Sequence, residues 1–483
     1  MCYFQADDAR QKQYYTEAAI TYYYFTHERE PGCRQQNAQL KKPLEKTTNV
    51  RGADRENLKK PKSSISSKRS GSSAVQPGHA ANAARNGLDK RNAMTDVILK
   101  KNRERSVIQG NPWIFSGSIA SVRGDTTPGS PCRILSAAGA PLGYGYYNRT
   151  SAISVRILSR GTVPFDNTTL AGRITASVNM RRPLIDADTD SCRLINSEGD
   201  FLPGLIVDRY AAGLVIQILT AGMERLRPAV IDALTASCKP AFIFERSDSE
   251  ARTREGLPLA EGLMAGTLPE PLVIRENGLL FSIDIAGGQK TGYFFDQRMN
   301  RSLLGHYAAG RRVADCFSYC GPFTCAALAA GAVSVDAIDQ SEGALELVKK
   351  NVALNGFSET AVTTIHTDIF KYLRRIDTTY DCIILDPPKF ARHPGEVERA
   401  SRGYKDVNLI ACKKIAPGGI IFTFSCSHAI DPRLFRQIVF AAAADSGRTF
   451  QLLHSLSAGP DHPVNLAHKE GEYLKGLVLR AQS

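Results

Sequence analysis

The chain has 483 residues, 43% of them hydrophobic, which is enough for ordinary packed cores in about three domains. No uninterrupted apolar run reaches about 18 residues, so a transmembrane helix is not expected. The net charge is +13: residues 1–93 hold 17 Lys and Arg against 9 Asp and Glu, and residues 94–483 hold 44 against 39. Most of the surplus therefore lies in the first segment, and the mildly basic remainder gives only weak support for an anionic partner.

Eleven cysteines are scattered along the chain without paired spacing. This pattern fits reduced thiols in the cytoplasm better than a disulfide framework. Cys316, Cys320 and Cys325 lie close together but lack Cys-x-x-Cys spacing and a completing histidine, so no metal site is predicted. The N-terminal residues also lack the apolar stretch of a secretory signal. We therefore expect a cytoplasmic protein without a membrane span.

The chain begins with an appendage, residues 1–93. Its stretch 62–88 is rich in Ser, Gly, Ala and Asn and cannot bury enough apolar surface to offset its ordering entropy. We expect the appendage to be disordered or not native, with Met94 as the natural start or as the start of the folded part. A basic arm that contacts RNA is the alternative. Residues 94–166 carry short strand-like runs separated by Gly and Pro, as in a small β-barrel. Trp113 is expected to fill its core, and a base-stacking platform is the alternative.

Residues 167–280 mix the two periodicities, with a hairpin predicted at 205–219 and a helix at Glu224–Cys238, so they indicate an α+β central domain. From 281 to 483, strand-like and helical runs alternate, which implies an α/β domain with a parallel, doubly wound, Rossmann-like sheet. Its predicted strands are 312–316, 333–338, 362–366, 382–385 and 419–424, and its predicted helices are 322–330, 342–355, 403–414 and 433–446.

In such a sheet, ligands bind at the carboxyl ends of the strands, near the point where the strand order reverses. The first strand carries Asp315 near its end and continues into Phe317, Ser318 and the pair Gly321-Pro322. Gly321 lets the backbone come close to a ligand, and Pro322 suits the first turn of a helix. The loop is not G-x-G-x-x-G, so a nicotinamide dinucleotide is poorly supported.

Two further carboxylates follow the next strands. Asp339 lies 24 residues after Asp315, a spacing that suits an acceptor for a ribose diol. Asp368 follows the third strand, where it could hold the exocyclic amine of adenine. Each also precedes a predicted helix, where a carboxylate often caps the backbone N–H groups. The sequence alone leaves both roles open for each residue.

The fourth strand is followed by Asp386-Pro387-Pro388-Lys389-Phe390. An acidic residue followed by two prolines makes a stiff, extended loop with few backbone donors. Such a loop can present Asp386 and its carbonyl groups to the amino group of a flat base, while the prolines and Phe390 offer stacking surface.

The fifth strand is followed by Ser425-Cys426-Ser427. Most free cysteines are buried and inert. A thiol at a strand end faces the cleft, so we predict that Cys426 is reactive.

These segments resemble the bacterial 23S rRNA cytosine-C5 methyltransferases of the RlmI type. The resemblance runs from about Met94 to the C-terminus and leaves out residues 1–93. It rests on the segments 196–205, 288–298, 386–390, 402–406, 424–427 and 461–463. One departure is Gly321-Pro322, where the family usually has two glycines.

The resemblance implies a PUA-like RNA-binding barrel, a central α+β domain and a C-terminal class I methyltransferase domain. It also implies S-adenosylmethionine as methyl donor and 23S rRNA, naked or in a large-subunit particle, as partner; a homodimer is a further hypothesis. The cofactor contacts it implies are Asp315, Phe317, Ser318, Gly321, Asp339, Asp368, Gln289, Lys290, Thr291, Gly292, Asp296 and Arg298.

The predicted mechanism is nucleophilic: a Cys426 thiolate adds to C6 of cytosine so that C5 can accept the methyl group. Asp386 would bind the base edge, and Pro387, Pro388, Lys389 and Phe390 would contact the base. Related enzymes with two cysteines have the second one where Lys389 stands, so the base that removes the C5 proton stays unassigned. The alternatives are a guanine N-methyltransferase with the same Asp-Pro-Pro loop and a non-catalytic RNA-binding assembly factor.

Overall fold

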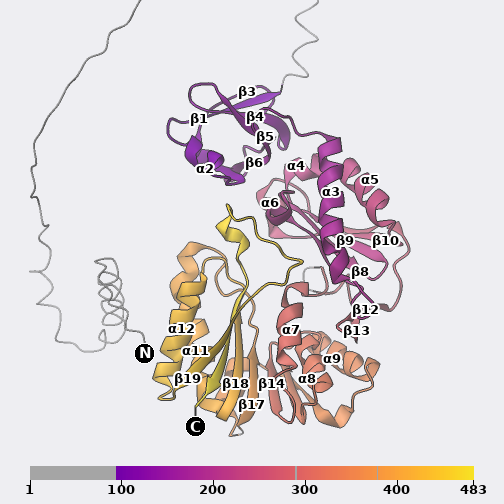
Figure 1. Ribbon diagram of the computed structural model, residues 1–483, viewed down its shortest axis with the longest axis vertical. Helices are drawn as coiled ribbons and strands as arrows, with labels where there is room; N and C mark the ends of the chain where they lie inside the picture. The colour runs from indigo at the N-terminus through magenta and orange to yellow at the C-terminus, as the bar shows by residue number, and fades with distance from the viewer. Residues whose placement is uncertain (1–93, 289–290, 378, 483) are drawn as a thin grey trace, which may run out of the picture. The chain divides into compact units, whose positions relative to one another are not determined.

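The computed structural model describes residues 94–288, 291–377 and 379–482. The expectations for residues 1–93 lie outside these ranges. The described residues form three main sheets and one separate hairpin, which follow one another along the chain (Figure 1). No helix in the described part of the chain has both the length and the apolar character needed to cross a bilayer.

The first sheet has six strands in the order β2-β6-β5-β4-β1-β3, with β1 parallel to β4 and the other pairs antiparallel. It curls into the predicted small barrel (Figure 1), and the core of this barrel includes Val97, Ile134 and Val155. Its elements are β1 (Thr95–Leu99), α2 (Glu104–Ile108), β2 (Trp113–Phe115), β3 (Ile119–Arg123), β4 (Ser130–Leu135), β5 (Pro141–Tyr147) and β6 (Ile153–Arg160).

The expectation that Trp113 fills this core is wrong. Its neighbour Ile114 is buried there, because successive residues of a strand point to opposite faces. The half-buried indole of Trp113 instead donates to Glu198 Oε1 at 2.7 Å, and its ring lies 4.3 Å from that of His468. Trp113 therefore joins the first sheet to two later segments of the chain.

The central sheet has the order β11-β10-β9-β8-β7, and α3 and α5 cover one face. The predicted hairpin is confirmed as β8 and β9, with Tyr210 paired to Gly213 across a two-residue turn. The elements are α3 (Asn167–Arg181), β7 (Cys192–Asn196), β8 (Leu205–Tyr210), β9 (Gly213–Ile218), α4 (Ala221–Arg225), α5 (Arg227–Cys238), β10 (Phe242–Ser247), α6 (Glu250–Arg254) and β11 (Ala260–Gly266).

The single helix predicted over Glu224–Cys238 is wrong, because the chain forms α4 and α5 there. Pro228 lies in the first turn of α5. Proline has no N–H for the helix ladder, and its ring clashes with the carbonyl four residues earlier. The first helix therefore stops at Arg225 and a new one begins at Arg227.

A hairpin of β12 (Leu272–Glu276) and β13 (Leu279–Ile283) connects the central sheet to the last one. The amide of Leu280 donates to Asn355 of the C-terminal part at 2.8 Å. The amide of Asp190, in the central part, donates to the carbonyl of Arg275 at 3.1 Å. The predicted domain boundary at 280/281 falls inside β13, in a hairpin that contacts both neighbours.

The C-terminal sheet has the order β16-β15-β14-β17-β18-β20-β19, parallel except for β20, which is antiparallel to both its neighbours. The predicted doubly wound α/β fold is confirmed, and the strand order reverses between β14 and β17. Its strands are β14 (Arg312–Cys316), β15 (Ser334–Asp339), β16 (Val362–His366), β17 (Tyr380–Leu385), β18 (Ile415–Ser425), β19 (Phe450–Ser457) and β20 (Lys475–Ala481).

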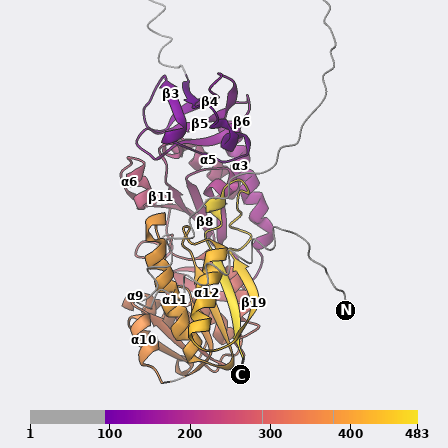
Figure 2. The ribbon, with the colours of Figure 1, turned by 90° about the vertical axis from the view of Figure 1, so that its left-hand side faces the viewer.

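Helices cover both faces of this sheet. Alternate residues of β14 divide between two cores: Val313 packs on the side of α8 and α9, and Ala314 packs on the side of α10, α11 and α12. Figures 1 and 2 show α11 and α12 side by side. The helices are α7 (Arg298–Leu304), α8 (Pro322–Ala329), α9 (Glu342–Leu354), α10 (Ile369–Arg375), α11 (Val397–Lys414) and α12 (Pro432–Asp445); α7, α10, β19 and β20 were not predicted.

Candidate active site

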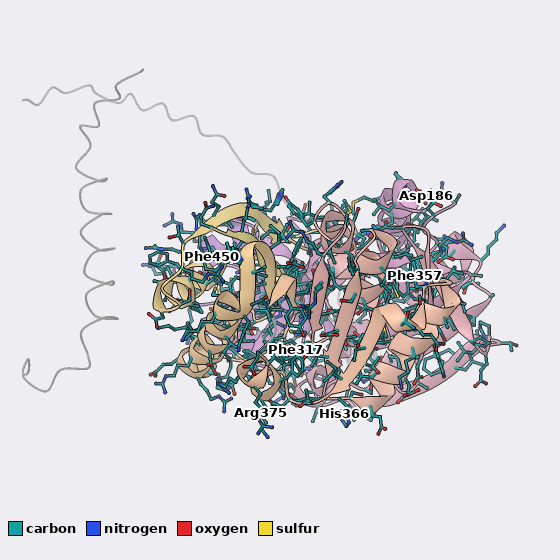
Figure 3. All side chains as sticks on the ribbon, turned by 90° about the horizontal axis from the view of Figure 1, so that it is seen from below. Asp186, Phe317, Phe357, His366, Arg375 and Phe450 are labelled. Atoms are coloured by element: carbon teal, nitrogen blue, oxygen red, sulfur yellow. The ribbon has the colours of Figure 1, made fainter. Side chains whose placement is uncertain are left out.

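The parallel strands bring the sequence-predicted residues to one edge of the C-terminal sheet. Cys316, the last residue of β14, lies opposite Ile338 of β15 and Leu385 of β17. Leu385 in turn lies opposite Thr423 of β18. Figure 3 labels Phe317, which follows β14, and His366, which ends β16. The segments after β14, β15, β17 and β18 therefore share this edge, beside the strand-order reversal.

The loop after β14 has an unusual backbone. Phe317 and Tyr319 have positive φ angles of 66° and 50°, and Gly321 has 79°. The amides of Phe317 and Ser318 both donate to the carbonyl of Ile338, at 2.9 and 3.1 Å. Residues other than glycine rarely adopt positive φ angles, and those that do are often found at ligand sites. The loop is therefore folded tightly over the end of β15.

Gly321 and Ser318 serve this loop in different ways. Gly321 is the N-cap of α8, and a Cβ added to it would lie 3.1 Å from Val348 Cγ1 of α9. The φ angle and helix packing thus require glycine there, independent of any ligand. The hydroxyl of Ser318 is buried and has no hydrogen-bond partner among the described residues. A buried hydroxyl without a partner costs free energy, so it marks a position where a ligand can bond.

Asp339 is held by two backbone amides. Its Oδ2 accepts from Tyr319 and its Oδ1 from Ser341, both at 2.9 Å. The N-cap of α9 is Ser341, so Asp339 does not play the capping role considered for it. A carboxylate has about four acceptor positions. The half-buried Asp339 therefore keeps acceptor capacity for a ribose diol.

Asp368 does cap a helix. Its Oδ1 accepts from the amide of Lys371 in the first turn of α10, and its Oδ2 accepts from Gln340 Nε2, both at 2.9 Å. The capping interpretation is therefore correct for Asp368. Its contact with adenine stays a prediction.

Two acidic groups of the site have perturbed pKa values. Burial raises the pKa of Asp315 to about 7, although a hydrogen bond from Thr324 Oγ1 at 2.7 Å lowers it in part. Burial, then the nearby carboxylate of Asp296, raises the pKa of Asp386 to about 7 as well. A positively charged ligand would offset this cost of ionisation.

The segment 288–298 reaches the site through side-chain hydrogen bonds. Tyr319 OH donates to the carbonyl of Gly292 at 2.9 Å, which joins this segment to the loop after β14. Gln297 Nε2 donates to Asp386 Oδ2 at 3.0 Å. The predicted set omitted Gln297, although it lies inside the segment that carries the family resemblance. Two predicted cofactor contacts of the same segment, Gln289 and Lys290, lie outside the described residues.

Other residues of this segment contact different parts of the fold. Thr291 Oγ1 donates to Asp208 of the central sheet at 2.7 Å. Asp296 accepts from Tyr473 OH at 2.6 Å, and Arg298 lies 4.0 Å from Asp461. These contacts fix the segment to the central sheet and to the residues around β20. The predicted cofactor contacts of Thr291, Asp296 and Arg298 stay predictions.

The Asp-Pro-Pro loop is linked to the segment around Cys426 through Ser427. The amide of Ala391 donates to Ser427 Oγ at 3.1 Å, and that hydroxyl also bonds Tyr404 OH at 2.9 Å. The ring of Phe390 lies 4.6 Å from that of Tyr404, so it helps to fix the loop on α11. Pro387 is buried, whereas Pro388 and Lys389 are exposed.

Cys426 differs from most other cysteines of the described chain. Seven of the nine described cysteines are buried, and only Cys238 and Cys426 are half-buried. Burial raises the pKa of Cys316 and Cys325, and it raises the pKa of Cys320 to about 12. These three thiols are therefore protonated at neutral pH. No group of three or more His, Cys, Asp or Glu side chains is placed to hold a metal in the ranges that the structure describes.

Comparisons with known proteins agree with this geometry. A PUA-like domain family matches residues 97–160, and an S-adenosylmethionine-dependent methyltransferase family matches residues 250–476. Ribosomal RNA large subunit methyltransferase I of Shewanella amazonensis is 40% identical over 390 residues, covering 80% of this chain and 98% of that protein. The protein of the same name from Tolumonas auensis is 41% identical over 394 residues, covering 80% and 99%.

The chain belongs to the ribosomal RNA large subunit methyltransferase I family. Its fold is also that of two solved structures, each 22% identical and covering 80% of this chain and all of theirs. One is a candidate methyltransferase from Streptococcus mutans, with a TM-score of 0.70, and the other is a candidate methyltransferase in complex with S-adenosylhomocysteine, with a TM-score of 0.71.

The C-terminal domain is thus an S-adenosylmethionine-dependent methyltransferase domain, and the strand-end site suits that cofactor. S-adenosylmethionine carries a positive sulfonium and a positive ammonium group. Asp315 is an acidic group whose ionisation a cation would favour, and the Ser318 hydroxyl offers a buried hydrogen-bonding group. Asp339 keeps acceptor capacity beside them.

Proposed function

We propose that this family member methylates C5 of a cytosine in 23S rRNA, with Cys426 as the nucleophile and Asp386 as the group that binds the base edge. The large-subunit rRNA follows from the names of the relatives. The observation that supports cytosine as the target base is the half-buried thiol of Cys426. This residue follows β18, and its neighbour Ser427 accepts a hydrogen bond from the end of the Asp-Pro-Pro loop. Guanine nitrogens are already nucleophilic and need no thiol.

Each residue has a chemical task in this proposal. C5 of cytosine is a poor nucleophile, and addition of the Cys426 thiolate to C6 makes C5 enamine-like. Negative charge then develops on the base, and a protonated Asp386 can donate a hydrogen bond or a proton to N3. With a pKa of about 7, Asp386 is partly protonated at neutral pH. Bound S-adenosylmethionine supplies the electrophilic methyl group; loss of the C5 proton and elimination of the thiolate complete the reaction.

The chain's own residues also suggest how the cofactor is held. The tight loop from Phe317 to Gly321 would enclose its methionine part, with Ser318 Oγ as a donor or acceptor. The free acceptor positions of Asp339 would take the ribose hydroxyls. Asp368 lies after the next strand and would take the adenine amine alongside its capping bond.

The remaining expectations complete the proposal. The PUA-like sheet would bind the rRNA, and the protein would act in the cytoplasm on naked rRNA or on a large-subunit particle. The domain limits proposed for the folded part are 94–166, 167–280 and 281–483. A homodimer stays a hypothesis, which light scattering of the purified protein would test.

The decisive experiment replaces Cys426 by Ala and probes the wild type with rRNA that contains 5-fluorocytosine. Fluorine at C5 blocks the last step, so a thiol that attacks C6 stays covalently bound to the RNA. We expect this adduct in the wild type, with C426A losing both adduct and methylation while it still binds S-adenosylmethionine. C238A, which changes the other half-buried cysteine, is the matched control and should behave as the wild type.

Other outcomes would support the alternatives. Methylation that survives in C426A would rule out the covalent route, and methylguanine in the product would establish a guanine N-methyltransferase. Cofactor binding without methyl transfer to any rRNA fragment or subunit particle would indicate a non-catalytic assembly factor.

A further inference from the structure

Lys475 is a buried lysine next to the segment that carries Cys426. It opens β20 and pairs across the sheet with Ser425, the residue before Cys426. Only 4% of Lys475 is exposed. Its Nζ donates to the carbonyl of Ser427 at 2.6 Å and to that of Ile430. The ammonium group therefore bonds the backbone directly after the cysteine.

The hydrogen-bond partners of this ammonium among the residues that the structure describes are backbone carbonyls, not carboxylates. Asp431 acts on it from a distance, but that carboxylate caps α12 by accepting from the amide of Leu434 at 2.7 Å. An ammonium removed from water without a counter-charge is costly. Burial accordingly lowers the pKa of Lys475 to about 8, and the charge of Cys426 works in the opposite direction.

We propose that Lys475 is a positioning residue that stabilises the thiolate of Cys426. This inference rests on the proposed function and deepens it. Two of the three Nζ–H groups hold the carbonyls of Ser427 and Ile430, which fixes the segment after the nucleophile. The positive charge then favours the thiolate, whose proton leaves to solvent. Lys475 forms no covalent bond and needs no contact with the RNA.

Around this pair, two phenols and one imidazole are neutral, so Asp431 and Lys389 are the other charged groups that act on Lys475. Cys426 also affects the pKa of Tyr473 and Tyr404, but burial raises the pKa of both phenols, so they are neutral at physiological pH. His428 is neutral too, because burial and the charge of Lys389 lower its pKa to about 4. Lys389 is exposed and repels Lys475.

The test measures how fast iodoacetamide alkylates Cys426 as a function of pH, read by mass spectrometry of the Cys426 peptide in the full-length protein. An opposite charge nearby lowers a pKa by roughly one to three units. In K475M we expect the alkylation midpoint to rise by about one unit or more, which makes alkylation about tenfold slower at neutral pH. K475R keeps the charge and should restore most of the rate.

Matched references are available in the same chain. Lys414, at the end of α11, also donates its ammonium to a backbone carbonyl, that of Ile376, so K414M controls for the loss of such a bond. Cys238 in every sample reports on general accessibility. If K475M shows the same pH midpoint for Cys426 as the wild type, Lys475 only braces the backbone and the proposal fails.

A reciprocal measurement covers the case in which K475M does not fold. The coupling between two charges is mutual, so removing the thiolate in C426A must lower the pKa of Lys475. NMR titration of lysine 13Cε signals would show this shift, and an unchanged Lys475 titration would overturn the proposal. Adduct formation with 5-fluorocytosine RNA tests the proposed function separately, because neither alkylation nor the titration depends on methyl transfer.

Discussion

Gln297 donates its side-chain amide to the carboxyl group of Asp386 at 3.0 Å and thereby joins the segment 288–298 to the Asp-Pro-Pro loop. The amide oxygen of Gln297 in turn accepts from Asn300 Nδ2 at 2.6 Å, and Asn300 also donates to the carbonyl of Ser457. Gln297 is itself buried. The orientation of Asp386 is therefore set by a chain of hydrogen bonds that begins on α7.

Replacement of Gln297 by Leu should lower kcat about two- to tenfold, because a neutral hydrogen bond contributes roughly 0.5–1.5 kcal/mol. The bond also lowers the pKa of Asp386, so its loss should raise that pKa further above 7. If protonated Asp386 acts on the base, the alkaline limb of the kcat/KM profile moves to higher pH in Q297L. Q451L, at an exposed position of β19, is the control, and an unshifted limb would argue against this role of Asp386.

The second prediction concerns Asp315 and the stability of the cofactor-free protein. Its ordinary pKa of 3.8 is raised to about 7 in the folded state. The folded state therefore holds a proton that the unfolded state has released between these pH values, and stability falls as the pH rises through 7. In D315N this contribution is absent, so the variant should gain Tm relative to the wild type as pH rises from about 4 to about 8.

Differential scanning calorimetry across this pH range would check the effect of D315N. D232N, at an exposed position of α5, is the control for loss of a carboxylate. A constant difference in D315N across this pH range would mean that Asp315 titrates normally in the folded protein.

Tyr319 carries the third prediction, because its hydroxyl bonds the carbonyl of Gly292 at 2.9 Å. Y319F removes this bond and keeps the ring against Phe294, 5.3 Å away. A neutral hydrogen bond contributes roughly 0.5–1.5 kcal/mol, so S-adenosylmethionine should bind about two- to tenfold more weakly by calorimetry. Y307F loses a similar bond, to His454, and should bind normally. Equal affinity in Y319F and the wild type would separate segment 288–298 from the cofactor site.

The strand-end residues could be predicted from the sequence because local patterns determine them. Buried parallel strands are short apolar runs, and the residues after them must meet at one edge of the sheet. Asp339, Asp386 and Cys426 were placed by this argument alone, and the register of β14, β15, β17 and β18 brings their segments together. Breaks within regular elements are harder to predict, because the helical period of the apolar residues continues across Pro228.

The contributions of the last part of the chain could not be predicted in this way. β20 inserts antiparallel between β18 and β19, and such long-range pairing leaves no local signature. Its first residue, Lys475, is charged and buried, the opposite of what a pattern based on burial suggests. Tyr473, just before β20, reaches Asp296 across 177 positions of sequence. Contacts of this kind depend on the assembled fold.

The last prediction concerns the ion pair of Arg301 and Glu276, which anchors α7 to the hairpin β12–β13. Two bonds of 2.6 and 2.8 Å join these side chains, and each is at most 3% exposed. The guanidinium also lies 5.0 Å from the centre of the Tyr293 ring. Removing one partner of a buried pair leaves the other charge without compensation, which costs roughly 3–5 kcal/mol.

E276A should therefore lower the Tm of the protein by several times more than E250A, which removes a carboxylate from the exposed pairs with Arg254 and Arg392. Surface pairs of that kind contribute about 1 kcal/mol at most. The double variant E276L/R301M places two apolar side chains in the same space and should recover most of the loss, because no unpaired charge remains buried. Equal Tm losses in E276A and E250A, measured by thermal unfolding, would show that the pair does not anchor α7.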